Sequence, residues 1–140
     1  AMSAELLATF KKAKAEQRAA FIGFVTAGYP KASETVEIMR AMQAGGTDVI
    51  ELGVPFTDPL ADGTTIQRTN EVALQGDSPV SLSNCLQITK QARAEGVSVP
   101  VILMGYFNPL LAYGLDKLMA DCKSSGDSRH HHFPPPHPCG

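Results

Sequence analysis

The order strand, loop, helix, repeated three times, is the feature that most limits what this 140-residue chain can fold into. Apolar runs at residues 20–25 and 99–104, and the strand-like stretch at residues 48–52, each lead into a loop rich in glycine or proline. Runs that are apolar at nearly every position are typical of strands buried on both faces of a parallel sheet. The repeat therefore predicts an α/β fold, although periodicity alone does not separate a barrel from a doubly wound sheet.

Helical spacing of apolar residues fills most of the chain around these runs. Ser33 is expected to cap one helix, which the pair Gly45-Gly46 should end. Further helices are expected over residues 5–17, 65–75, 81–95 and 115–122, with Gly76 and Gly96 ending those at 65–75 and 81–95. Because loops at the carboxyl ends of parallel strands build the active sites of α/β proteins, the loops after the three runs are the places to look for chemistry.

The composition is that of a soluble globular protein, with 44% hydrophobic and 19% charged residues. A net charge of -2 gives no reason to expect nucleic acid or an anionic membrane as a partner, and no apolar run is long enough to span a bilayer. No secretory leader is visible, and three widely spaced cysteines indicate the reducing cytoplasm. Cys85 lies in a helical pattern and is expected to be a small core residue.

Glu51 stands among apolar residues near the carboxyl end of the second run. A buried carboxyl with a raised pKa can both give and take a proton near neutral pH, as general acid/base catalysis requires. The alternative is a structural glutamate held by a neighbouring strand or by a helix N-terminus. Asp62, before Gly63, and Asp58, before Pro59, lie in the following loop and would by themselves be ordinary turn residues.

Residues 50–67 as a whole carry the pattern E-L-G-x-P-[FY]-[ST]-D-P-x-A-D-G-x-x-I-Q, which resembles the signature of the tryptophan synthase α-subunit family. Every specified position matches, and Thr64 stands in a tolerant slot where the family usually has proline. Residues 24–30 and 104–109 resemble the family's first and third strand-loop segments. The resemblance covers about residues 5 to 123, in order and with the family's spacing.

The resemblance implies the N-terminal part of a TIM (β/α)₈ barrel, with about three βα units. It also implies retro-aldol cleavage of indole-3-glycerol phosphate to indole and glyceraldehyde 3-phosphate, in tryptophan biosynthesis. Glu51 then matches the general acid/base, and Asp62 the carboxylate that accepts the indole N–H. Phe24 and Tyr106 match positions that line the indole pocket, although both could equally be plain core aromatics. This carbon–carbon lyase reaction needs no metal or organic cofactor, because pyridoxal phosphate belongs to the β-subunit or fused β domain.

A complete barrel takes roughly 250 residues, and its phosphate-binding loops commonly follow the seventh and eighth strands. The 140-residue chain is therefore expected to show no measurable lyase activity alone. An alternative is a non-catalytic fragment that only associates with the β-subunit, through residues 53–63 and 106–113. Another barrel enzyme acting on a phosphorylated ligand is disfavoured by the full signature.

The composition changes abruptly after residue 123, so residues 1–123 are taken as the barrel segment and residues 124–140 as an unrelated tail. All four histidines and four of the ten prolines fall in the last eleven residues, which predicts disorder. We hypothesise that the reading frame is lost near Gly126. The competing interpretation is a metal site made from His130, His131, His132, His137 and Cys139.

Overall fold

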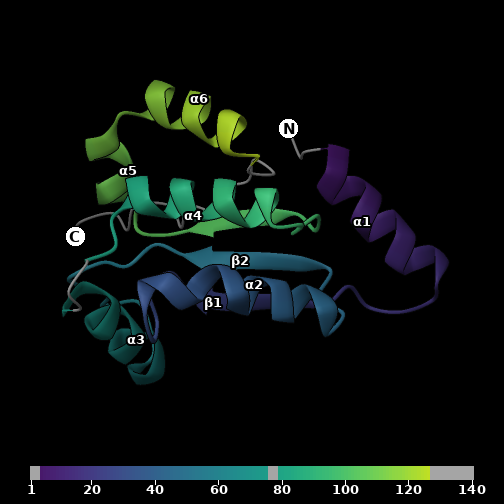
Figure 1. Ribbon diagram of the computed structural model, residues 1–140, viewed down its shortest axis with the longest axis horizontal. Coiled ribbons are helices and arrows are strands. Elements are labelled where there is room, and N and C mark those ends of the chain that lie inside the picture. Colours follow the sequence, from purple (N-terminus) through teal and green to yellow (C-terminus); the bar gives the residue numbers. More distant parts are fainter. Residues whose placement is uncertain (1–3, 76–78, 127–140) are drawn as a thin grey trace, which may run out of the picture.

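Three parallel strands form one sheet in the order β1-β2-β3, in a computed structural model that describes residues 4–75 and 79–126 (Figure 1). The strands are β1 (Ile22–Thr26), β2 (Val49–Gly53) and β3 (Val101–Met104). Phe24 pairs with Glu51, and Glu51 with Ile102, so all three strands are in parallel register. This confirms the expected α/β architecture with about three βα units.

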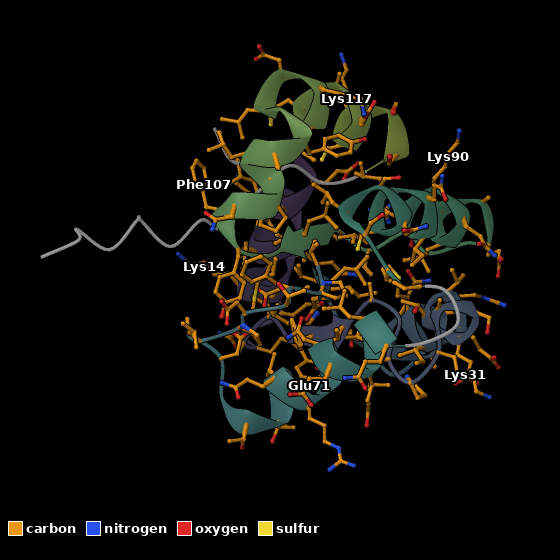
Figure 2. The ribbon with its side chains drawn as sticks, turned by 90° about the vertical axis from the view of Figure 1, so that its left-hand side faces the viewer. Lys14, Lys31, Glu71, Lys90, Phe107 and Lys117 are labelled. Atoms are coloured by element: carbon orange, nitrogen blue, oxygen red, sulfur yellow. The ribbon has the colours of Figure 1, made fainter. Side chains whose placement is uncertain are left out.

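The helices are α1 (Ala4–Ala15), α2 (Thr35–Ala44), α3 (Thr64–Gln75), α4 (Leu82–Ala94), α5 (Phe107–Tyr113) and α6 (Leu115–Ser125), and a 3-10 turn, η1 (Ala32–Glu34), precedes α2. Helix α4 packs against both α2 and α6, so these three helices form one layer. Charged side chains such as Lys90 and Lys117 point outward from this layer (Figure 2).

The two faces of the sheet are covered differently, because side chains alternate along each strand. Ile50, Leu52 and Leu103 face the helical layer and are at most 2% exposed. Val49 and Ile102 point to the other face, where Leu6 of α1 packs on them. Helix α1 therefore closes the amino-terminal end of the face that a barrel turns inward.

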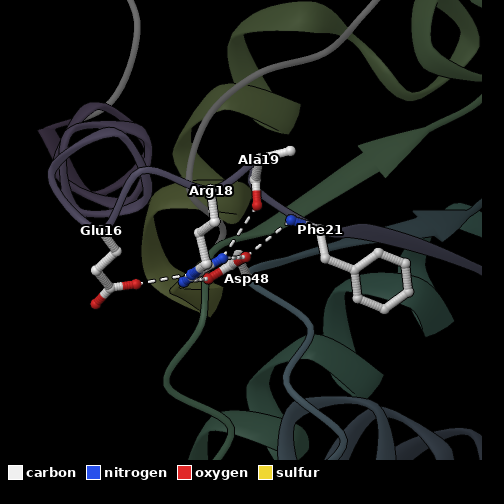
Figure 3. Close-up of polar contacts among 5 residues, drawn as sticks. All are labelled: Glu16, Arg18, Ala19, Phe21 and Asp48. Carbon is white, nitrogen blue, oxygen red and sulfur yellow. Dashed lines mark hydrogen bonds and ion pairs between the residues drawn. The ribbon is translucent and has the colours of Figure 1, made fainter.

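Polar contacts join the start of β1 to the start of β2 (Figure 3). Arg18 donates to both oxygens of the Asp48 carboxylate, at 2.5 and 2.7 Å, and to Glu16 at 2.7 Å. Asp48 also accepts from the backbone N–H of Phe21 at 2.8 Å. The Arg18 guanidinium and this backbone N–H lower the pKa of Asp48 to about 2.

Two expectations about the helices were wrong. Ser33 does not cap a helix, because it lies inside η1; α2 begins after Glu34, whose side chain makes no capping hydrogen bond. Residues 107–113, expected as a loop, form α5. Asn108-Pro109 resembles a turn, but the first turn of a helix leaves its N–H groups unpaired, so Pro109 is tolerated there.

The glycine stops predicted after the helices differ in outcome. Gly46 and Gly96 have φ values of +93° and +95°, a conformation that glycine adopts without strain, which confirms them as helix ends. Gly76, expected to end α3, lies outside the described residues. Helix α6 extends two residues beyond the proposed boundary at residue 123, and that boundary stays a prediction.

Candidate functional site

A cavity of about 190 Å³ lies at the carboxyl ends of the strands. It is bounded by the ends of β1, β2 and β3, by the loop after β2 and by the first turns of α3. Its walls are mainly apolar, and its lining residues are Phe24, Thr26, Gly53, Val54, Ala61, Asp62, Ile66, Asn70, Met104, Gly105 and Tyr106. A mainly apolar cavity with few polar groups, at this end of a parallel sheet, is suited to a small flat ligand.

Three of the four residues predicted from the sequence meet in this cavity. Phe24 enters it from β1, Tyr106 from the end of β3, and Asp62 from the loop after β2. The Phe24 ring lies directly over Gly53, where an added Cβ would be 2.6 Å from Cζ of the ring. The absence of a side chain at Gly53, the glycine of the E-L-G motif, therefore leaves the space that the Phe24 ring occupies on the sheet.

Glu51 is the exception, since it is not among the residues that line the cavity. It shares the Phe24 face of the sheet, and it lies two residues before Gly53 on β2, roughly 7 Å farther from the cavity mouth. The side chain is half-buried rather than enclosed. Its carboxylate makes no hydrogen bond or ion pair with any other residue in the ranges 4–75 and 79–126.

Tyr106 connects the end of β3 to the loop that carries Asp62. Its ring stacks on Phe56, with centroids 4.8 Å apart and an interplanar angle of 26°. Its hydroxyl accepts a hydrogen bond of 2.9 Å from the backbone N–H of Ala61. Burial raises the pKa of the Tyr106 phenol, and the Asp62 carboxylate beside it raises this pKa further.

Two polar side chains of α3 hold the same loop from the other side. Asn70 accepts from the N–H of Phe56 at 3.0 Å, and its own amide nitrogen donates to the Ile66 carbonyl at 2.9 Å. Gln67 donates to the Asp62 carbonyl at 3.0 Å and to the Pro59 carbonyl at 3.3 Å. Sequence reasoning missed both roles, although the spacing of three residues puts both side chains on one face of the helix.

Metal and thiol chemistry find no support in the described part of the chain. Within residues 4–75 and 79–126, no group of three histidine, cysteine or acidic side chains could hold a metal ion. Cys85 is fully buried, and burial raises the pKa of its thiol to about 12, so the expectation of a core residue is confirmed. The proposed tail ligands, His130, His131, His132, His137 and Cys139, lie outside the described residues.

No helix in the described ranges is long and apolar enough to cross a membrane.

The sequence matches a family model described as "Tryptophan synthase alpha chain" over residues 10–128. A tryptophan synthase of Saccharomyces cerevisiae is 52% identical over 125 residues, which are 89% of this chain and 17% of the yeast protein. A tryptophan synthase alpha chain of Methylibium petroleiphilum is 46% identical over 121 residues, which are 86% of this chain and 44% of that relative.

Solved structures agree with the sequence matches. Tryptophan synthase subunit alpha of Legionella pneumophila superposes with a TM-score of 0.84 at 37% identity, over 91% of this chain and 47% of that one. An aminoacrylate-bound tryptophan synthase from M. tuberculosis superposes with a TM-score of 0.86 at 35% identity. The match covers 96% of this chain and 53% of that one. The chain thus spans less than half the length of the curated relatives, and its three-stranded sheet is part of a TIM barrel.

Proposed function

Because the chain belongs to the tryptophan synthase alpha chain family, we propose that it carries the two carboxylates that cleave indole-3-glycerol phosphate to indole and glyceraldehyde 3-phosphate. The observation that best supports this is the meeting of Phe24, Tyr106 and Asp62 in one mainly apolar cavity. Two aromatic rings offer flat walls to an indole, and one carboxylate among them offers an acceptor for its N–H.

The proposed reaction breaks the bond between indole C3 and the first glycerol carbon. Glu51 donates a proton to C3 and then, as a carboxylate, takes the proton of the hydroxyl on that carbon. The hydroxyl oxygen becomes the aldehyde oxygen, while the electrons of the broken bond return to the indole ring. The Asp62 carboxylate accepts a hydrogen bond from the indole N–H while the ring carries positive charge, and this contact stabilises the intermediate. No cofactor takes part in this scheme.

Glu51 fits this role because its half-buried carboxylate has no partner within the described residues that would hold it away from substrate. It lies on the cavity side of the sheet, below the Phe24 ring. A reacting glycerol carbon would have to lie between the indole cavity and Glu51, deeper than the ring itself.

Indole binding tests the proposal in the chain as it stands. We expect indole to shift the NMR signals of the backbone amides of Asp62 and Tyr106, because both residues line the cavity. Asp62→Asn should weaken indole binding about tenfold, since it removes the charged hydrogen-bond acceptor. Asp58→Asn is the matched control: this aspartate is exposed in the same loop and does not line the cavity. Equal affinities for the two variants would contradict the role of Asp62.

Turnover is a separate question from binding. The chain spans 44% of its Methylibium relative, and the phosphate-binding loops of a barrel commonly follow its last two strands. We therefore expect no indole release from indole-3-glycerol phosphate by the 140-residue chain alone. Turnover near that of a full-length relative, abolished by Glu51→Gln, would contradict this expectation and support the catalytic role of Glu51.

We also propose that the loops after β2 and β3 associate with a tryptophan synthase β-subunit or fused β domain, which would hold pyridoxal phosphate. Leu60 lies on the loop after β2, and Leu111 lies on α5, which follows β3. They are 83% and 55% exposed, so they offer apolar contact area. Association with the β-subunit of a relative, measured by calorimetry, should be weakened by Leu60→Asp and unchanged by Glu51→Gln. Unchanged affinity for Leu60→Asp would exclude this surface.

A further inference from the structure

Helix α3 holds the loop that carries Asp62, yet apolar packing anchors this helix only weakly. Of its 12 residues, Asn70 and Ala73 are buried, whereas six residues of α4 are buried. Packing of an apolar face normally fixes a helix on a sheet. The position of α3 therefore depends more on polar contacts than the position of α4 does.

Two residues on one face of α3 meet the end of β1. The hydroxyl oxygens of Thr69 and Thr26 are 2.7 Å apart. One turn further along the helix, Ala73 lies over Gly28, where an added Cβ would be 3.2 Å from the Ala73 methyl group. Thr69 and Ala73 are four residues apart and therefore share a face of the helix. This face joins α3 to the strand that carries Phe24.

The hydrogen bond between the two threonines has a fixed direction. The Thr69 hydroxyl donates its single proton to the Ile66 carbonyl at 2.8 Å, so toward Thr26 it can only accept. The Thr26 hydroxyl is therefore the donor. Because Thr26 is only 3% exposed, loss of the Thr69 oxygen would leave a buried donor without this acceptor, which is costly.

The Ile66 carbonyl links this contact to the loop after β2. It accepts from Thr69 and also from the amide nitrogen of Asn70, at 2.9 Å. The Asn70 oxygen in turn accepts from the N–H of Phe56, at the start of that loop. A chain of hydrogen bonds therefore runs from β1 through α3 to the loop that carries Asp62.

We propose that Thr26 and Thr69 are positioning residues, whose hydrogen bond fixes α3 on the end of β1 and so sets how far the Asp62 loop stands from the Phe24 ring. The inference rests on the proposed function only in giving Asp62 the role of acceptor for an indole N–H. Thr26 lines the cavity, whereas Thr69 does not. An effect of Thr69 on a ligand must therefore act through the position of α3.

Hydrogen exchange tests the anchoring of α3 without a ligand. In Thr69→Val, which keeps the shape of the side chain, the backbone amide of Phe56 should exchange about tenfold faster, because α3 opens more often without its polar anchor. Thr69→Ser keeps a hydroxyl and should exchange at the wild-type rate. Equal exchange of Phe56 in Thr69→Val and the wild-type chain would overturn the proposal, as would equal exchange in the Ser and Val variants.

The matched control is Thr89→Val on α4. The Thr89 hydroxyl is buried and donates to the Cys85 carbonyl of its own helix at 2.9 Å, so its loss should leave the exchange of Phe56 unchanged. A faster exchange of Phe56 in Thr89→Val, equal to that in Thr69→Val, would show that any lost threonine hydroxyl has this effect and would overturn the proposal.

Combining the substitutions tests whether the two hydroxyls act through one bond. Thr26→Val should speed the exchange of Phe56 as Thr69→Val does, and the double variant should exchange no faster than Thr69→Val. Additive effects would mean that the two residues act independently, against the proposal. Since Thr69 is only half-buried, its variants should fold even if Thr26→Val does not, and Thr69→Val then decides.

Indole affinity tests whether the anchoring of α3 positions Asp62. Thr69→Val should weaken indole binding about fivefold, although Thr69 does not line the cavity, and Thr69→Ser should bind indole as the wild-type chain does. Unchanged affinity in Thr69→Val would overturn the positioning role. Failure of the wild-type chain to bind indole would count against the proposed function instead, and the exchange of Phe56 would then decide this inference alone.

Discussion

The two ends of the same sheet are built for different purposes. At the amino-terminal end, Arg18 and Asp48 satisfy one another with two hydrogen bonds, and Leu6 is buried on Val49 and Ile102. At the carboxyl end, a cavity remains between the strands, the Glu51 carboxylate has no partner within the described residues, and Leu60 is exposed.

The contrast shows how a parallel sheet divides stability from chemistry. Contacts at the start of the strands join consecutive segments and leave little room for a ligand. Contacts at their ends are made mainly by loop backbone and by Tyr106, Gln67 and Asn70, which shape a space without filling it. This is the division that barrel enzymes show between their two rims.

The largest expected effect comes from opening the amino-terminal end. Leu6→Ala should lower the free energy of unfolding by about 3 kcal/mol, because it leaves a cavity over Val49 and Ile102. Urea denaturation followed by circular dichroism measures the change. The matched substitution at the other end, Leu60→Ala, should change stability by less than about 0.5 kcal/mol, because Leu60 is 83% exposed.

Similar losses for Leu6→Ala and Leu60→Ala would contradict the contrast between the two ends. They would mean that the loop after β2 is packed against the remainder of the chain and that α1 is not. The exposed fractions of 5% for Leu6 and 83% for Leu60 make the opposite result the expected one.

A smaller effect is expected from filling the carboxyl end. Gly53→Ala places a Cβ 2.6 Å from the Phe24 ring, so the ring must move into the cavity. Overpacking of this kind should cost about 1–2 kcal/mol of stability. It should also reduce the free energy of indole binding by more than it reduces the free energy of unfolding, because the displaced ring occupies the space of the ligand. Ala substitution at Gly46 is a poor control, since its φ of +93° adds strain; Gly63→Ala, with open space around the site, is the better one.

Measuring both stability and indole affinity in Gly53→Ala shows whether the space next to Phe24 binds the ligand. If stability falls while indole affinity is unchanged, the space next to Phe24 is not where an indole binds. If Gly63→Ala has the same effect as Gly53→Ala, the cause lies in the flexibility of the loop and not in the Phe24 ring.

Periodicity was sufficient to predict the strands and most of the helices, whereas the expectation that Phe24, Asp62 and Tyr106 share one pocket came from the family resemblance. Periodicity identifies buried strands directly, and parallel strands bring the loops at their carboxyl ends together. The match to the family pattern then distinguished Asp62 from an ordinary turn residue, which its own neighbours could not do.

The remaining features depend on tertiary contacts that leave no periodic signal. Helix α5 has only seven residues, too few for a clear apolar face, and its Asn108-Pro109 pair resembles a turn. The roles of Asn70 and Gln67 depend on the path of a loop that touches them only after folding. The position of Glu51 outside the cavity lining follows from register and from the Phe24 ring over Gly53, neither of which a single strand reveals.

The smallest effect we predict concerns the charge pair at the amino-terminal end and is visible as a dependence on pH. The pKa of Asp48 is about 2 in the folded chain and 3.8 in the unfolded reference, so the carboxylate stabilises the fold above pH 4. This contribution should be lost as the pH falls from about 4 to 2, because the unfolded chain takes up the proton first. Since the Arg18 side chain is 40% exposed, solvent screening keeps this contribution small. Asp48→Asn should therefore destabilise the chain at pH 7 and flatten this part of the pH dependence.

The control is Asp58→Asn, which removes an exposed carboxylate at the carboxyl end and should have neither effect. An equal response of both variants to pH would show that the Arg18–Asp48 pair contributes no more than an ordinary surface charge, and the contrast between the two ends would then rest on Leu6 alone.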